Sequence, residues 1–131
     1  MKKMPRLLCD TRFFVECFFS DNPDFQLRAR DLVSRNKERI VSVVTLHELY
    51  LLEVTKRGRE IAKLRVQGVQ DLFRIAEVNS QIAIDAAEIR SKHKVPMGDS
   101  LIAATCKNVD AQCVTDDPHL TEMKELKTRW I

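Results

Sequence analysis

Glycine, proline and tryptophan are scarce in this sequence, and long apolar runs are missing. Its 131 residues include three glycines, four prolines and one tryptophan. This scarcity excludes collagen-like and linker-rich chains, and no apolar run approaches the roughly 18 residues that a membrane span requires. Charged residues make up 31% and are mixed in sign, which argues against a disordered tail. The 44% of hydrophobic residues can fill one core, so we expect a single soluble domain over residues 1–131.

The cysteines lack the spacing of a disulfide framework or a zinc site. There is no C-x-x-C pair, and no histidine stands near a cysteine at the spacing that zinc sites use. Free cysteine in apolar surroundings behaves as a small hydrophobic residue. We therefore predict core thiols in a reducing compartment, and so a cytoplasmic protein. The residues concerned are Cys9, Cys17, Cys106 and Cys113.

The net charge of +3 is small, but the basic residues are clustered. They gather in three stretches, at 28–39, 56–65 and 92–94. Two interpretations stay open: solvated helix faces with ion pairs four residues apart, or a surface that binds phosphate groups. Charge alone favours the solvated faces.

Strand-like and helix-like segments alternate along the chain. Short apolar runs predict strands at 7–9, 40–44, 75–78 and 112–115, with an edge strand at 128–131. Helical spacing and capping residues predict helices at 12–19, 23–36, 45–55, 61–72, 80–89, 96–104 and from 118 onward. This alternation indicates an α/β fold: a three-layer sandwich with a central, mostly parallel sheet flanked by helices.

Acidic residues follow the predicted strands or begin the helices beside them. In parallel sheets, ligands bind beyond the carboxyl ends of the strands, and four separate segments deliver an acid there: Asp10, Glu48, Asp99, and the pair Asp116 and Asp117. Each could instead cap a helix, and Thr45 to Glu48 has the pattern of a capping box. Capping explains the positions but not the repeated choice of an acid. We therefore predict a shared divalent cation, Mg²⁺ or Mn²⁺, which prefers oxygen ligands.

A cation held by carboxylates suits phosphodiester hydrolysis. Such an ion polarises a phosphate oxygen and lowers the pKa of a bound water. A polyanionic substrate also reconciles an acidic pocket with basic surroundings, because lysine and arginine side chains can hold the flanking phosphates.

Four stretches of the sequence resemble the motifs of PIN-domain ribonucleases of the VapC toxin type: 7–11, 43–49, 98–105 and 114–120. The resemblance implies a PIN-like fold and a metal-dependent endoribonuclease that cleaves RNA. It also implies a homodimer and a small antitoxin partner. It assigns catalytic and metal-binding roles to Asp10, Glu48, Asp99 and Asp117, and makes Asp116 a neighbour on the metal or phosphate side.

The sequence departs from these motifs at two positions. Arg12 stands where a small polar residue is usual, and Leu120 replaces the usual phenylalanine. Arg12 leaves a second interpretation open: a catalytically inactive PIN-like scaffold that binds RNA or a protein. A haloacid-dehalogenase-type phosphatase would need an aspartate where Arg12 stands. A receiver-type domain would need an acidic pair where Cys9 and Asp10 stand.

Histidine and phenylalanine residues are weaker candidates. No two of His47, His93 and His119 lie close enough in sequence to suggest a metal pair, so we assign them surface or structural roles. Of these, His93 stands between two lysines and is the one to test for RNA contact. The phenylalanines at 13, 14, 18 and 19 could stack on bases. Their near-helical spacing favours the core or a dimer interface.

Overall fold

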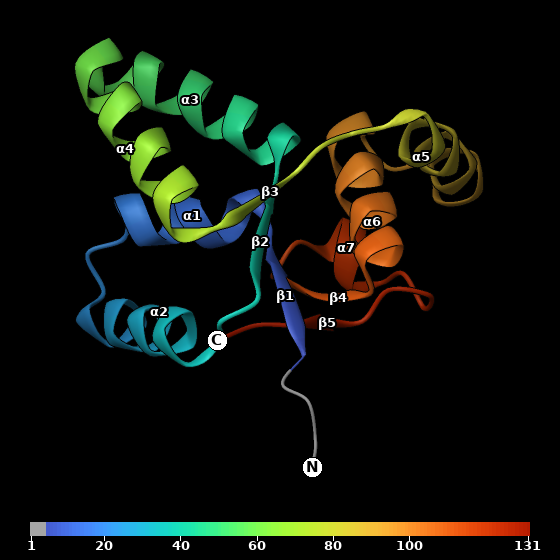
Figure 1. Cartoon of the computed structure of the whole chain (residues 1–131), viewed down its shortest axis with the longest axis horizontal. Coiled ribbons are helices and arrows are strands. Elements are labelled where there is room, and N and C mark those ends of the chain that lie inside the picture. The colour runs from blue at the N-terminus through green and yellow to red at the C-terminus, as the bar shows by residue number, and fades with distance from the viewer. Residues whose placement is uncertain (1–4) are drawn as a thin grey trace.

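A computed structural model describes residues 5–131 and has a five-stranded sheet at its centre (Figure 1). The strands are β1 (Arg6–Cys9), β2 (Arg39–Ser42), β3 (Arg74–Ala76), β4 (Ala111–Val114) and β5 (Thr128–Arg129). They lie in the order β3-β2-β1-β4-β5, and every pair is parallel. The all-parallel arrangement confirms the predicted sheet.

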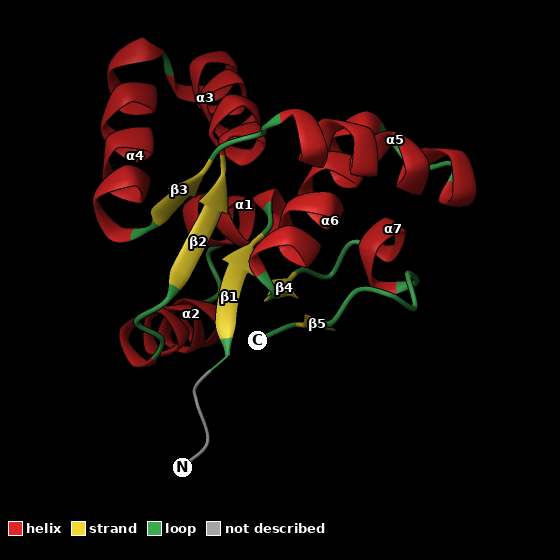
Figure 2. Ribbon diagram, turned by 45° about the vertical axis from the view of Figure 1, so that its right-hand side comes forward, coloured by secondary structure: helices red, strands yellow, loops and turns green. Residues whose placement is uncertain are grey.

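Helices cover both faces of the sheet and make the three predicted layers (Figures 1 and 2). One face packs against α1 (Thr11–Phe19), α2 (Pro23–Arg35), α3 (Val43–Arg57) and α4 (Arg59–Leu72). The other packs against α5 (Ser80–His93), α6 (Met97–Val109) and α7 (Pro118–Thr121). Within residues 5–131, none of these helices has the length and hydropathy needed to cross a bilayer.

Alternating strand residues feed two separate cores because successive side chains point to opposite faces. Leu7 and Cys9 of β1 pack with the α1–α4 layer, whereas Leu8 between them packs with the α5–α7 layer. Cys9, Cys106 and Cys113 are buried and Cys17 is partly buried; all four are free thiols, as predicted. Phe13 and Phe14 are also buried, and their rings meet edge to face with centroids 5.2 Å apart. The core interpretation of these two phenylalanines is therefore confirmed.

The start of α3 differs from the prediction. Val43 and Val44 were expected to continue a strand, but the strand ends at Ser42, whose hydroxyl accepts a hydrogen bond from the Val44 N–H at 3.0 Å. The cap therefore lies three residues before Thr45, and the predicted capping box of Thr45 and Glu48 is wrong. β-Branched valines favour strands, so their run pointed to the wrong element, and the cap at Ser42 overrides that preference. Glu48 is consequently free for another role.

The order in which strands are added to the sheet changes side between β1 and β4, although every strand runs in the same direction. From β1 the chain proceeds to β2 and β3 on one side, and it later returns to β4 and β5 on the other. Such a reversal opens a crevice at the carboxyl ends of the two central strands, because their connections leave in opposite directions. The acids after β1 and β4 lie at this crevice.

Asn79 begins α5, which decides between two candidate caps, Asn79 and Ser80. The Asn79 side chain accepts a hydrogen bond from the Ile82 N–H at 2.9 Å. We expect Asn79→Ala to lower the free energy of unfolding by about 1 kcal/mol, because it removes this bond. Ser80→Ala, at the first helical position, should change it by less than about 0.5 kcal/mol. Urea denaturation measures both, and equal losses would contradict the assignment.

Candidate metal centre

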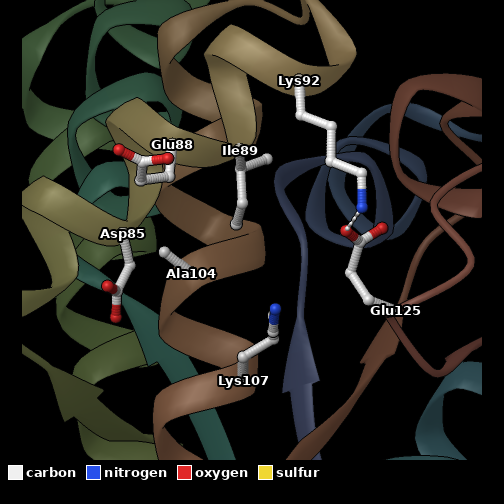
Figure 3. A pocket seen from close by; sticks show the side chains of 7 residues that line it. All are labelled: Asp85, Glu88, Ile89, Lys92, Ala104, Lys107 and Glu125. Atoms are coloured by element: carbon white, nitrogen blue, oxygen red, sulfur yellow. Dashed lines mark hydrogen bonds and ion pairs between the residues drawn. The ribbon is translucent and has the colours of Figure 1, made fainter.

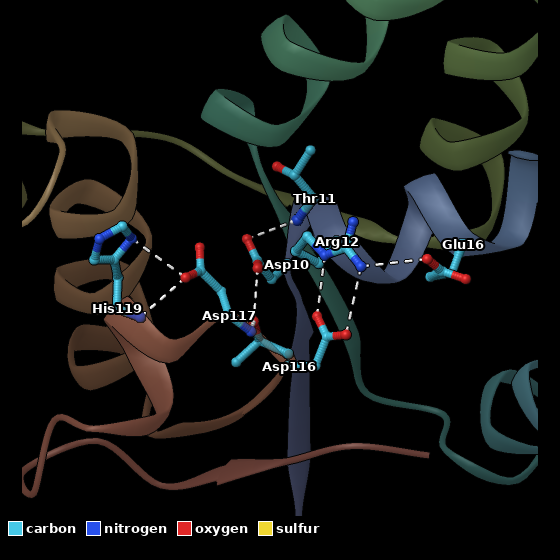
Figure 4. A network of polar contacts seen from close by, with 8 residues as sticks. Asp10, Thr11, Arg12, Glu16, Asp116, Asp117 and His119 are labelled. Carbon is cyan, nitrogen blue, oxygen red and sulfur yellow. Dashed lines mark hydrogen bonds and ion pairs between the residues drawn. The ribbon is translucent and has the colours of Figure 1, made fainter.

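Asp10 directly follows β1, at the carboxyl end of a central strand (Figure 4). It is buried, and both of its carboxylate oxygens accept hydrogen bonds. Oδ1 accepts from the Thr11 N–H at 2.7 Å, which caps α1, and Oδ2 accepts from the Thr115 hydroxyl at 2.7 Å. Asp10 can therefore cap α1 and also belong to the candidate site, because one oxygen bonds the helix and the other bonds Thr115.

Asp117 lies beside Asp10 and is connected to it through Thr115. The Thr115 hydroxyl donates to Asp10 and accepts a hydrogen bond from the Asp117 N–H at 3.0 Å. The Asp117 carboxylate caps α7 by accepting from the His119 N–H at 2.9 Å. One buried threonine after β4 thus fixes the acids of two different strands relative to each other.

Asp99 lies in the first turn of α6, in the layer of α5, α6 and α7. The cap of that helix is Pro96, so the interpretation of Asp99 as an N-cap is wrong. Its Oδ2 lies 3.1 Å from Nδ1 of His119, and Oδ1 of Asp117 lies 3.3 Å from the same nitrogen. Ligand atoms of Asp99, Asp117 and His119 all lie within 4.8 Å of one another. These three residues could hold a metal ion.

Sequence reasoning gave His119 a surface or structural role and missed this position. Its side chain is 54% exposed, in keeping with a surface location, yet its ring lies between two of the predicted acids. The available signal was its place two residues after Asp117, in the first turn of α7. Capping brings the first turn of a helix back toward the capping side chain.

Glu48 reaches the same crevice from α3. Its Oε1 accepts a hydrogen bond from the Thr11 hydroxyl at 2.6 Å, and that hydroxyl also lies 3.1 Å from the Thr45 hydroxyl. Its Oε2 comes so close to Gly98 that a Cβ atom there would lie only 3.2 Å away. Gly98 therefore leaves room for the carboxylate directly beside Asp99, and Glu48 touches residues that adjoin both Asp10 and Asp99.

Burial and mutual repulsion make the ionised form of these acids unfavourable. Desolvation raises the pKa of Asp10 to about 6, and the charges of Asp117 and Glu48 add to the rise against two opposing hydrogen bonds. Desolvation also raises the pKa of Asp99 to about 6, with contributions from Asp117 and Asp10. A shared divalent cation would remove this repulsion, since it favours the charged form of every acid around it.

Asp116 is the one predicted site residue that the structure places apart from the others. It pairs with Arg12: its Oδ1 lies 3.1 Å from Nε and its Oδ2 3.4 Å from Nη2 (Figure 4). Nη2 also donates to Glu16 at 3.2 Å. Arg12 is therefore held by two acids outside the group of Asp10, Glu48, Asp99 and Asp117.

His93, the histidine singled out for RNA contact, has a carboxylate partner. Its Nε2 lies 2.9 Å from Oε1 of Glu125, and this hydrogen bond holds the pKa of Glu125 at about 2. Lys92 pairs with the same carboxylate at 3.3 Å. A pocket of about 300 Å³ adjoins this cluster, between α5, α6 and the segment after α7 (Figure 3). It is lined by none of the predicted site residues.

An all-parallel sheet with one buried and three half-buried carboxylates at its switch point defines an α/β domain with a candidate metal centre. The PIN domain family model matches residues 7–126, and the chain belongs to this family. A comparison with curated protein sequences found no match.

Solved structures with the same fold include chains of toxin–antitoxin complexes. One is VapBC2 from Rickettsia felis bound to a promoter DNA fragment, with 15% identity, a TM-score of 0.79, and 95% of this chain and 98% of that chain covered. DNA-bound VapBC from Salmonella typhimurium gives 18% identity, a TM-score of 0.79, and 97% and 98% coverage. VapC20 from Mycobacterium tuberculosis, a toxin that cleaves the sarcin–ricin loop, gives 15% identity, a TM-score of 0.72, and 86% and 90% coverage. The three share the fold of this chain.

We expect Asp99→Asn to stabilise the metal-free protein near neutral pH. In the unfolded chain Asp99 has its ordinary pKa of 3.8, against about 6 in the fold. The folded state therefore binds more protons in this window and loses stability as the pH rises from about 4 to about 6. Removing the charge should raise the free energy of unfolding near pH 7.5 by on the order of 1 to 3 kcal/mol.

Urea denaturation with a chelator present measures this gain, which should vanish near pH 4, where the folded Asp99 is protonated. Asp85→Asn, which removes an acid of α5 outside the crevice, is the matched control. A gain of equal size at both pH values, or a loss of stability near neutral pH, would contradict the electrostatic account.

Proposed function

We propose that this protein is a metal-dependent endoribonuclease that hydrolyses phosphodiester bonds of RNA. The observation that carries the proposal is the convergence of Asp10, Glu48, Asp99 and Asp117 from four separate elements onto the switch point of the sheet. Membership of the PIN domain family and the fold of a known RNA-cleaving toxin support a nuclease.

The donor set fits Mg²⁺ or Mn²⁺, because hard cations prefer carboxylate oxygens. We assign Asp10, Asp99 and Asp117 as metal ligands, with Glu48 beside them. His119 lies against two of these acids. A cation bound there would supply Lewis acidity toward a phosphate oxygen and toward water.

The chain's own residues orient these acids for the reaction. Thr115 holds Asp10 and Asp117 at a set distance, and Thr11 holds Glu48. Such fixed carboxylates need no rearrangement when charge develops in the transition state. His119 is the most exposed of these side chains, so the substrate phosphate would approach past it.

We further propose that the protein is the toxin of a toxin–antitoxin pair with a small antitoxin as partner. An apolar groove runs between α1 and α4, lined by Phe14, Phe18, Leu64, Val69 and Leu72 among others. Leu64 is 71% exposed at its rim. Such a groove suits an apolar side chain or segment of a partner, and the structural neighbours from Rickettsia felis and Salmonella typhimurium are toxin–antitoxin complexes. An apolar antitoxin segment would cover the groove.

The remaining parts of the proposal are that the chain acts as one domain, as a homodimer and in the cytoplasm. The alternative that the sequence left open is a scaffold that binds RNA or protein without cutting it. The pairing of Arg12 with Asp116 and Glu16 disfavours that alternative, because the arginine leaves the four acids free of an ion pair with it.

We expect cells that express the protein to accumulate RNA cut at defined positions. Sequencing of RNA ends after brief expression should show new 5′-phosphate ends, and Asp99→Asn should reduce them at least about 100-fold, because it removes a metal ligand. The purified protein should cleave an RNA that contains such a position, more slowly as salt rises. Folded Asp99→Asn protein that cleaves at the native rate would refute the site.

We expect wild-type protein to bind Mn²⁺ in a calorimetric titration near neutral pH. The crowded acids favour a divalent cation, so Asp99→Asn should weaken binding at least about 10-fold, whereas Asp85→Asn should not. Binding should also weaken below about pH 6, where Asp10 and Asp99 become protonated. The scaffold alternative predicts that wild type shows no specific binding heat.

A further inference from the structure

Arg12 departs from the family motif, and the structure shows how its guanidinium is held. It projects from the first turn of α1, two residues after Asp10. Asp116, which precedes Asp117, accepts two hydrogen bonds from one edge of the guanidinium, at Nε and Nη2. Arg12 is thus bracketed by the two chain segments that bring Asp10 and Asp117 to the crevice.

The contacts of Arg12 leave part of its donor set open. Glu16 takes a second contact at Nη2, whereas Nη1 donates to no acceptor among residues 5–131. Hydrogen bonding to Asp116 raises the pKa of Arg12, so the side chain keeps its charge. Nη1 carries two N–H groups, so it can donate to a phosphate oxygen while Nε and Nη2 stay bonded to the two acids.

Stability gives no sufficient reason for this arrangement. The side chains of Arg12 and Asp116 are 43% and 37% exposed, and ion pairs between such exposed groups contribute little to folding. Replacing Arg12 should therefore leave the melting temperature nearly unchanged. For a variant at Arg12, weaker RNA binding with an unchanged melting temperature therefore cannot be a consequence of unfolding.

We propose that Arg12 binds a phosphate of the RNA adjacent to the bond that is cut, and that Asp116 and Glu16 position its guanidinium. Asp116 then serves the RNA site through Arg12 and is not a metal ligand. This inference rests on the proposed ribonuclease function and adds a residue that determines how the RNA is placed.

The first test measures cleavage of a short RNA that contains a position identified by end sequencing. Arg12→Gln should raise KM about 10-fold and leave kcat within a factor of about 3, because a contact to a flanking phosphate is made in the ground state and the transition state alike. The slope of log(kcat/KM) against log salt should become shallower by about 0.7, the value for one lost phosphate contact with a single strand.

Arg35→Gln is the matched control. Arg35 also pairs with an acid four residues away, Asp31 at 2.9 Å, and lies on α2, where it is more exposed than Arg12. The Arg35→Gln substitution removes the same charge and the same kind of ion pair at a place outside the crevice. KM and the salt slope should therefore keep their wild-type values. If Arg12→Gln behaves as Arg35→Gln does, the assignment is overturned.

The second test locates the phosphate. Replacing one linkage at a time by a neutral methylphosphonate should weaken wild-type binding about 10-fold at the contacted position. Arg12→Gln should lose nothing further at that position, since the two changes remove the same contact. Fluorescence anisotropy in an Asp99→Asn background measures this without cleavage. Additive losses at every linkage near the cut would overturn the proposal.

The third test concerns Asp116. Asp116→Asn should raise KM less than Arg12→Gln does. The double variant should have the KM of Arg12→Gln alone, because Asp116 acts through Arg12. Its Mn²⁺ affinity should equal that of wild type. An affinity as weak as that of Asp99→Asn would make Asp116 a metal ligand and refute its positioning role.

The outcomes also separate this inference from the proposed function. If wild type leaves every RNA intact, the ribonuclease proposal and the role of Arg12 fail together. If wild type cleaves and Arg12→Gln has the same KM and salt slope, only the role of Arg12 fails. Arg12→Lys should recover part of the lost affinity, because it restores the charge without the guanidinium that Asp116 and Glu16 hold in place.

Discussion

Repulsion among carboxylates gathered at one edge of the sheet is the constraint on which the rest of the structure depends. Asp10 and Asp99 have pKa values raised to about 6 because burial and neighbouring acids disfavour their charges. The fold tolerates this because hydroxyl groups satisfy the oxygens: Thr115 bonds Asp10, and Thr11 bonds Glu48. The acids are thus held in place before any cation binds, which is what a preorganised metal centre requires.

Two apolar cores make this arrangement rigid. Both faces of the sheet are covered, so β1 and β4 lie where side chains above and below them leave no freedom to shift. Elements from both helical layers then deliver acids to one crevice: α3 from one layer and α6 from the other. The placement of these acids therefore depends on packing well away from them.

Most of the fold was predictable because its signals are local. Short apolar runs and caps such as Asn22 mark where strands and helices begin. The boundary at Ser42 was not predictable, because the β-branched Val43 and Val44 favour a strand and the cap at Ser42 overrides that preference. For the site, the acids that directly follow β1 and β4 nominated Asp10 and the pair Asp116 and Asp117. The resemblance to PIN-domain motifs favoured Asp117. His119 was missed because its importance comes from where α7 places it beside α6.

The sequence by itself determined the parallel sheet, the two-sided core and the identity of the acids at its edge, since each depends on residue type and spacing along the chain. Only the tertiary structure decided how neighbouring acids divide their partners. Asp116 and Asp117 are adjacent in sequence, yet one faces Arg12 and the other faces Asp99 and His119. The partner of each acid depends on which side chains the fold brings next to it from distant segments. Neighbouring residues along the chain carry no signal for those contacts.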